Sequence, residues 1–408
     1  MGKLTYNTYR RIQVGKGEKP VPHTTADVLF MLLRSQIEPN YTLPDMAIDQ
    51  EMYASLYALS KHHDMAHLLA AALEENGIMP EHQGLVAKLR KQYLLALSRT
   101  ERIIYELDRI ACTFEASEIP FLPLKGSVLR EYYPRTWMRT SCDIDILIHP
   151  NDLEAAQSAL ESKLGYPPSS NRTSHDISYY TESGVHLELH FTLIESEVVG
   201  KEDKPLEHVW AHATLKEGKQ FTYELDSQMF YYYHIAHMVK HFVLGGCGIR
   251  PFLDMYIYQT KTGICAQEIA PWLEESGVLT FAREAETLAG VWFGGEPHTS
   301  LTRRMEDYLL KAGVYGSMEN RVAIQQTQKG GKWAYFWYRV WLPYSVLKHH
   351  YPSLDGRPWL LFFYQVRRWW KLLFGGKAKR YVKELKRNQE FDDAKKAENA
   401  QFLQELGL

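Results

Sequence analysis

The order of apolar and polar residues divides the chain into helical and strand-forming stretches. Thr24-Thr25-Ala26-Asp27 predicts the cap of a first helix. From Met46 to about Ser117, apolar residues recur three and four positions apart, and Pro80 divides the stretch into two groups. We expect a packing domain here, with Leu94 and Leu95 in its core.

After Ser117 the pattern changes to the alternation that is typical of strands. Ile119 to Leu124 predicts one strand, and Asp143 to Ile148 predicts another. Asp143 and Asp145 are two positions apart, so both carboxylates leave the same face of the second strand. The opposite face takes Cys142, Ile144, Ile146 and Ile148.

A third acid follows on a later strand. Residues 177–181 and 185–193 flank the turn Glu182-Ser183-Gly184, which predicts a hairpin. On its second arm His186, Glu188 and His190 point one way. The apolar residues that alternate with them point the other way: Val185, Leu187, Leu189 and Phe191. Three carboxylates can therefore converge on one face of one sheet.

Carboxylates this close repel one another unless protons or cations neutralise them. Oxygen-only ligands favour Mg²⁺ or Mn²⁺ over zinc. A pair of such ions can stabilise the attacking and leaving oxygens of a phosphoryl displacement. The pattern thus predicts a metal site at Asp143, Asp145 and Glu188.

A second stretch fits phosphate chemistry. Gly126-Ser127 opens a short predicted helix that extends to about Tyr133. Backbone N–H groups at a helix start attract phosphate, and Lys125 adds a positive charge beside them.

These residues resemble a known family. The strand ending in Lys125-Gly126, the Arg139 that precedes Asp143-Ile144-Asp145, and the strand with Glu188 and His190 are similar to nucleotidyltransferases with a DNA-polymerase-beta-like palm. The resemblance covers residues 49 to 370. It implies that Asp143, Asp145 and Glu188 bind metal, that Gly126 and Ser127 hold nucleotide phosphates, and that the nucleotide is an NTP. The loop between Ser127 and Asp143 is longer than is usual in that superfamily, and the third acid is Glu where Asp is common.

The resemblance and the pattern together predict an α+β fold, a small mixed-sheet palm flanked by helical regions. We divide the chain into a flexible arm (1–22), an N-terminal helical region (23–117), the palm (118–225), a C-terminal helical domain (226–330), an aromatic-rich helical segment (331–376) and a charged tail (377–408), which we expect to fray from Asn388 onward.

The helix after Ser227 carries histidines on one face. His234, His237 and His241 are three and four positions apart, with Lys240 beside them. A zinc site is conceivable, although no further ligand is evident, and contact with a bound anion or acceptor is the favoured interpretation. Arg250 is a further candidate substrate residue, and it stands at ion-pair spacing from Asp254.

The segment from Trp333 to Phe374 is rich in Trp, Tyr, Phe and Arg. Such a segment can lie in a membrane interface, cover the palm or form a dimer contact. Lys377, Lys379, Arg380, Lys383, Lys386 and Arg387 follow it, and we interpret them as a solvated helix face.

Composition limits the alternatives. The 408 residues carry a formal charge of −2, which argues against a protein that wraps nucleic acid. Four cysteines without a CxxC pair favour a reduced, cytoplasmic setting. No apolar stretch has the length of a signal peptide or a spanning helix, so we expect a bacterial-type cytoplasmic protein, at most peripheral at the inner membrane surface.

We therefore expect a Mg²⁺- or Mn²⁺-dependent enzyme that moves a nucleoside monophosphate from an NTP to an unknown acceptor. Lys125, Gly126, Ser127 and Arg139 would bind the triphosphate, and Glu188 would be a metal ligand or the base. His190, His237, Lys240, His241 and Arg250 are candidate substrate contacts. Two alternatives remain open: a sugar-nucleotide glycosyltransferase, and a non-catalytic nucleotide-binding or regulatory module attached to a membrane surface.

Overall fold

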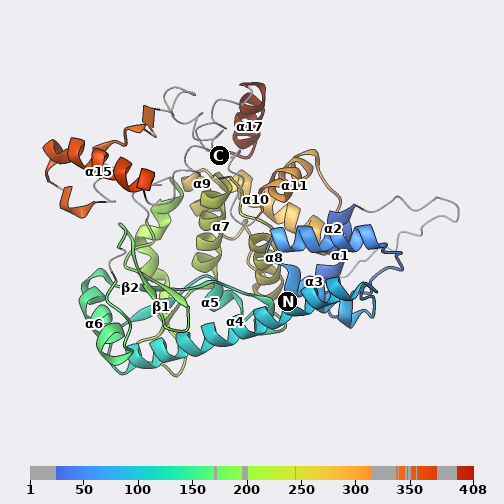
Figure 1. The fold of residues 1–408 in the computed structure, drawn as a ribbon, viewed down its shortest axis with the longest axis horizontal. Coiled ribbons are helices and arrows are strands. Elements are labelled where there is room, and N and C mark those ends of the chain that lie inside the picture. The colour runs from blue at the N-terminus through green and yellow to red at the C-terminus, as the bar shows by residue number, and fades with distance from the viewer. Residues whose placement is uncertain are drawn as a thin grey trace, which may run out of the picture.

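A computed structural model describes residues 24–169, 172–194, 201–243, 245–313 and 393–408, and most of 337–374. A four-stranded sheet lies at one end of the molecule, and α7 (Ser227–Val243) stands near its centre (Figure 1). The predicted arm at residues 1–22 lies outside the described residues.

Four helices form the N-terminal region: α1 (Thr25–Ile37), α2 (Gln50–His62), α3 (Ala66–Glu75) and α4 (Gln83–Glu115). The cap predicted for α1 is confirmed, because the Thr24 side chain accepts from the Asp27 N–H and the Asp27 carboxylate accepts from the Thr24 N–H. At 33 residues, α4 is about 50 Å long and runs from the N-terminal helices to the sheet (Figure 1).

The expected burial of Leu94 and Leu95 is wrong. Their side chains are 62% and 44% exposed. This part of α4 connects two cores, and only one narrow side of it, which includes Ala96 and Thr100, is buried. Leu89 is the last fully buried α4 residue of one core, Tyr93 and Leu97 pack at its edge, and the buried residues of the other core begin at Ile103.

The sheet contains β1 (Phe121–Pro123), β2 (Asp143–Ile148), β4 (His186–His190) and β3 (Asp176–Tyr180), in that spatial order. The predicted hairpin is the antiparallel pair β3 and β4, and β1 is antiparallel to β2. β2 and β4 are parallel, and the crossover between them contains α6 (Leu153–Lys163) and β3. A separate two-stranded sheet pairs β5 (Ala213–Leu215) with β6 (Tyr223–Leu225).

Alternate residues of the strands serve two different cores. Ile144, Ile146 and Leu187 are fully buried with the C-terminal half of α4 and with α6. Leu122 and Leu147 belong to the other core, which the N- and C-terminal helices share. The predicted assignment of strand residues to faces is therefore confirmed, and the acidic residues lie on the face that the helical regions approach.

The C-terminal helical region contains α7, α8 (Arg250–Thr262), α9 (Ala270–Ser276), α10 (Leu279–Ala289) and α11 (Ser300–Ala312). α5 (Gly126–Leu129) follows β1, and α15 (Leu361–Phe374) belongs to the aromatic-rich segment. The mixture of many helices with one small mixed sheet confirms the α+β class. No helix among the described residues is long and apolar enough to cross a bilayer.

The expectation that the charged tail frays is wrong for its last residues. α17 (Asp393–Glu405) ends the chain, and Phe402, Leu403 and Leu406 are buried in the shared core. The Phe402 ring lies 5.5 Å from the ring of Tyr308 on α11. Phe402 and Leu403 in the last turn of α17, with Leu406 just after it, dock the helix despite the charge of the residues before them.

Burial of His67 predicts that the protein loses stability in mild acid. Its Nε2 donates to the Met138 carbonyl over 3.0 Å, and burial lowers the pKa of His67 to about 4 from 6.5. The folded form therefore binds fewer protons than the unfolded chain between pH 6.5 and 4. We expect the free energy of unfolding to fall across this window, by up to roughly 3 kcal/mol from this residue, and to level off below pH 4.

Urea unfolding at several pH values measures this effect. His67→Gln keeps a donor for Met138 and should lessen the fall between pH 6.5 and 4, whereas His208→Gln, at an exposed position far from His67 in the sequence, should leave it unchanged. An identical pH dependence in wild type and His67→Gln would assign the acid sensitivity to other groups.

Candidate active site

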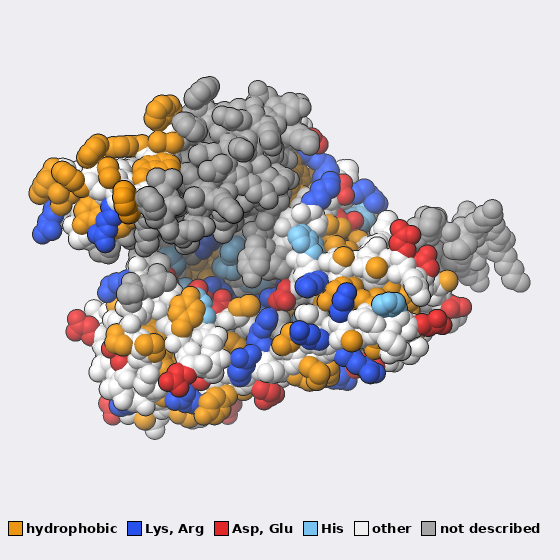
Figure 2. Space-filling view, viewed as in Figure 1, with side chains coloured by type: hydrophobic (Ala, Val, Ile, Leu, Met, Phe, Trp, Pro, Cys, Tyr) orange, Lys and Arg blue, Asp and Glu red, His pale blue; other side chains and the backbone are white. Residues whose placement is uncertain are grey.

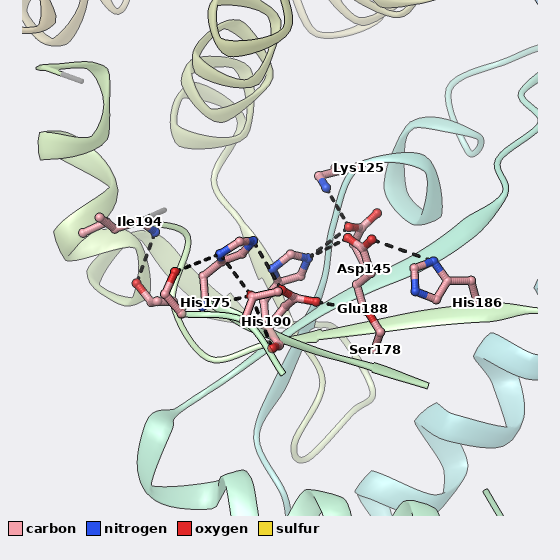
Figure 3. Close-up of polar contacts among 12 residues, drawn as sticks. Lys125, Asp145, His175, Ser178, His186, Glu188, His190 and Ile194 are labelled. Atoms are coloured by element: carbon pink, nitrogen blue, oxygen red, sulfur yellow. Dashed lines mark hydrogen bonds and ion pairs between the residues drawn. The ribbon is translucent and has the colours of Figure 1, made fainter. Parts of the chain in front are cut away.

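The register of β2 against β4 brings the predicted acids together. Asp145 pairs with Glu188, and Asp143 pairs with His186. Paired residues of neighbouring strands leave the same face of a sheet, so the three carboxylates share one face. The Glu188 side chain is 27% exposed and points to Asp145 and the histidines rather than into the core (Figure 3).

Lys125 provides the nearest compensating charge. Its Nζ lies 2.6 Å from Asp145 Oδ1 (Figure 3). Burial opposes a charge on Lys125, but the attraction of Asp145 outweighs it and raises the pKa of the ammonium well above its usual range. The same contact and the hydrogen bond from His190 lower the pKa of the buried Asp145. Both partners are therefore charged at neutral pH.

The backbone at Lys125 is strained. Its φ is +45° and its ψ is −119°, a conformation that residues with a Cβ rarely adopt. Such conformations cost on the order of 1–3 kcal/mol and persist where the surroundings hold them. Here the junction of β1 and α5 aims the ammonium at Asp145.

His190 connects the two acids across the strands. Its Nε2 lies 3.0 Å from Asp145 Oδ1 and 3.5 Å from Glu188 Oε2. Burial disfavours a proton on this ring, but the hydrogen bonds to Asp145 and Glu188 raise the pKa of His190. His186 lies on the other side of Glu188, with its Nδ1 3.8 Å from Glu188 Oε1.

Two overlapping groups of side chains have the spacing of metal ligands. Asp143, His186 and Glu188 form one group, and Asp145, Glu188 and His190 form the other. Within each group the ligand atoms lie within 4.8 Å of one another, and Glu188 belongs to both. Three carboxylates with imidazole at the edge suit a hard divalent cation such as Mg²⁺ or Mn²⁺.

The surroundings of Asp143 disfavour its charge. Partial burial and then the neighbouring Asp145 carboxylate raise the pKa of Asp143, while Lys125 works in the opposite direction. An added cation at this point would relieve the repulsion, which is the electrostatic condition of a metal site.

The sequence profile of a family described as "uncharacterised nucleotidyltransferase" matches residues 50–294, more than half of the chain. The chain belongs to this nucleotidyltransferase family. The match runs from the start of α2 to the turn after α10 and confirms the resemblance drawn from the sequence, together with the class of enzyme, a transferase. No curated protein and no solved structure matches the chain.

The phosphate-binding residues predicted for this nucleotidyltransferase lie beside the acids. α5 is only four residues long, and Ser127 is buried with no hydrogen-bond partner for its Oγ. Gly126 lies against Ser141, where an added Cβ would come within 3.1 Å of the Ser141 Cβ. Arg130 fixes this loop by donating to the Gly126 carbonyl at 2.8 Å and to Ser141 Oγ at 2.9 Å.

Arg139, also predicted to contact phosphate, is committed to a buried ion pair. Its Nε lies 2.7 Å from Asp254 Oδ1 on α8, and its Nη1 donates to the Thr140 carbonyl. The Tyr133 hydroxyl donates to the same Asp254 oxygen at 2.6 Å. In this conformation Arg139 positions the loop that leads to Asp143.

Arg250 does not pair with Asp254, the partner that its spacing allowed. Its guanidinium binds the carboxylate of Asp64, in the turn between α2 and α3, and the Asp64 carbonyl. Arg250 thereby joins α8 to the N-terminal helices, and its predicted contact with substrate has no support in this arrangement.

The helix α7 brings His237 near Lys125 and pairs it with His241. His237 Nε2 lies 3.1 Å from His241 Nε2, and burial, then His241, then Lys125 lower the pKa of His237 well below its usual value. His234 Nε2 instead forms a hydrogen bond of 2.8 Å with the Pro251 carbonyl. The three histidines therefore do not form one metal cluster among the described residues.

Sequence reasoning missed several residues of the site. Arg130 and Tyr133 lie in the predicted short helix but were given no role, and Asp254 was assigned to the wrong arginine. Tyr233, one helical turn before His237, also interacts electrostatically with Lys125. Its position four residues before His237, on the same face of the helix, is the sequence feature that could have identified it.

Removing Asp254 tests the positioning role of the buried pair. Asp254→Ala leaves the Arg139 guanidinium buried without a counter-charge, and we expect a loss of about 3–5 kcal/mol in the free energy of unfolding. Glu75→Gln is the control, because its ion pair with Arg135 is about half exposed and should be worth less than about 1 kcal/mol. Equal losses in urea titrations of the two variants would contradict this ranking.

Proposed function

We propose that this nucleotidyltransferase moves a nucleoside monophosphate from an NTP to a hydroxyl or similar group of a small acceptor and releases pyrophosphate. The observation that carries the proposal is the shared face of Asp143, Asp145 and Glu188, with Lys125 directly beside it. A non-catalytic binding module, the alternative, would not require three carboxylates aligned on neighbouring strands.

Asp143, Asp145 and Glu188 would hold Mg²⁺ or Mn²⁺. Their carboxylate oxygens are the ligands such ions prefer, and the repulsion that raises the pKa of Asp143 favours an added cation. A bound ion would supply the positive charge that stabilises the oxygens of a phosphoryl displacement.

Lys125 would exchange partners when a nucleotide binds. In the described conformation it neutralises Asp145, and a triphosphate next to Gly126 would offer it a stronger negative partner. Lys125 would then hold phosphate oxygens while Asp145 becomes available to a cation. Ser127, whose hydroxyl has no partner, is the nearest uncommitted polar group of the same loop.

Glu188 would complete the set of ligands or accept the proton of the acceptor. His190 and His186 fix its carboxylate from both sides. A carboxylate held in this way can take a proton from a hydroxyl within hydrogen-bond reach, so geometry allows both roles.

The acceptor would approach from α7. The low pKa of His237 keeps its ring neutral, and a neutral imidazole can donate to or accept from a hydroxyl group. Lys240 follows on the same helix and would suit an acceptor that carries an anionic group. The net charge of −2 favours a small acceptor over a polynucleotide.

Asp145→Asn should abolish pyrophosphate release. The amide keeps the size of the side chain but loses the charge that Lys125, His190 and a cation require, so we expect at least a hundredfold lower rate with the fold retained. Glu182→Gln, in the exposed turn between β3 and β4, is the matched control and should keep the wild-type rate. A folded Asp145→Asn protein with undiminished release would end the proposal.

Lys125→Met should change nucleotide and metal binding in opposite directions. Loss of the ammonium removes a phosphate contact and should raise the KM for NTP at least tenfold. It also removes a competitor for Asp145, so Mn²⁺ should bind the nucleotide-free protein more tightly in a titration followed by electron paramagnetic resonance. Lys88→Met, at an exposed position on α4, should change neither quantity. Weaker Mn²⁺ binding by Lys125→Met would contradict the exchange of partners.

The substrates can be identified directly. The protein is incubated with Mg²⁺ and each of the four NTPs, with a metabolite extract as the source of acceptor, and products are measured by mass spectrometry. A nucleotide-sized mass increase on a metabolite, dependent on Asp145, identifies both substrates.

A further inference from the structure

The segment around α15 exposes a continuous apolar surface. Trp359, Phe362, Phe363, Val366 and Trp370 are between 51% and 70% exposed, and they recur three and four positions apart. Residues at this spacing lie on one side of a helix. Figure 2 shows the hydrophobic side chains of this segment gathered at the upper left of the molecule.

The opposite side of α15 is packed. Gln365 is fully buried and donates to the Leu342 carbonyl, and Trp369 Nε1 donates to the Val340 carbonyl at 3.0 Å. Leu347 and Leu354 are fully buried beneath it. The helix is therefore held in one orientation, and its exposed face is a consequence of that packing. Trp337 and Trp341, at 60% and 45% exposed, extend the exposed apolar surface to the neighbouring segment.

Positive charge is concentrated in the same part of the chain. Residues 337–387 contain two acids, Asp355 and Glu384, and twelve basic residues: Arg339, Lys348, Arg357, Arg367, Arg368, Lys371, Lys377, Lys379, Arg380, Lys383, Lys386 and Arg387. The whole chain has a formal charge of −2, so the remainder is strongly acidic. Of the described members, Arg357 and Arg367 are exposed beside the aromatic face.

We propose that this surface docks on an anionic membrane. Aromatic rings prefer the interface of a bilayer, and nearby Arg and Lys bind acidic headgroups. A helix of 14 residues is too short to span and suits a position in the plane of the surface. A second copy of the chain would bring two equally basic segments together, which opposes a dimer through this face. In Figure 1, α15 lies at the same end of the molecule as the four-stranded sheet, so docking would hold the catalytic site close to the membrane.

Vesicle flotation of the full-length protein tests the proposal. The protein should float with vesicles of three parts phosphatidylcholine and one part phosphatidylglycerol, and at least tenfold less should float with phosphatidylcholine alone. Phe362→Ser combined with Phe363→Ser should lower the floated fraction at least tenfold, and Arg357→Gln should lower it and weaken its dependence on salt.

Leu94→Ser combined with Leu95→Ser is the matched control. It removes two exposed apolar side chains from α4, outside the proposed docking surface, and should leave flotation unchanged. Circular dichroism and pyrophosphate release report whether each variant is folded. In addition, lipids brominated in the acyl chain should quench the tryptophan fluorescence of the protein, and Trp359→Phe with Trp370→Phe should reduce that quenching.

Three results would overturn the inference. Equal flotation of wild type and the Phe362, Phe363 variant would show that the aromatic face is not the docking surface. Failure of the wild type to float would exclude an anionic membrane. Elution as a dimer that the same two substitutions dissociate would assign the face to a second copy of the chain.

Discussion

The ion pair between Lys125 and Asp145 makes the rest of the site possible. Three carboxylates share one face of a small sheet, and without compensation their repulsion would oppose folding. Lys125 supplies the compensation at 2.6 Å, and the protein keeps a rare backbone conformation at the end of β1 to place it there. A strained, charged residue at the junction of a strand and a helix is costly for stability alone, which is why it indicates function.

That ion pair depends in turn on the pairing of β2 with β4. A shift of one residue would turn Glu188 into the core and bring Leu187 or Leu189 to the acidic face. The register is fixed because both faces of the sheet are packed, one against α4 and α6 and the other against the core shared by the helical regions. Packing on both sides therefore determines where the charges meet.

The part of the site that follows from local pattern could be predicted from the sequence. Alternation alone places Asp143, Asp145 and Glu188 on the polar faces of their strands, and the hairpin turn fixes the direction of β4. The partners of the arginines could not be predicted, because Arg139 meets Asp254 and Arg250 meets Asp64 across large sequence separations. Spacing of three or four residues suggested Asp254 for Arg250, but tertiary packing turned the two side chains toward different elements. The exposure of Leu94 has the same origin, since helical periodicity cannot show where a long helix leaves one core before reaching the next.

The buried pairs also suggest how the helical regions influence the chemistry. Arg139 joins Asp254 of α8 to the Thr140 carbonyl, and only three residues separate Arg139 from Asp143. Arg250, at the start of the same helix, holds the turn between α2 and α3. A shift of α8 would therefore move the loop before β2 and the N-terminal helices together. Because α7 packs on α8, the position of His237 is tied to the same set of contacts as the position of Asp143. The sheet supplies the acids, and the helices hold the loop that leads to them.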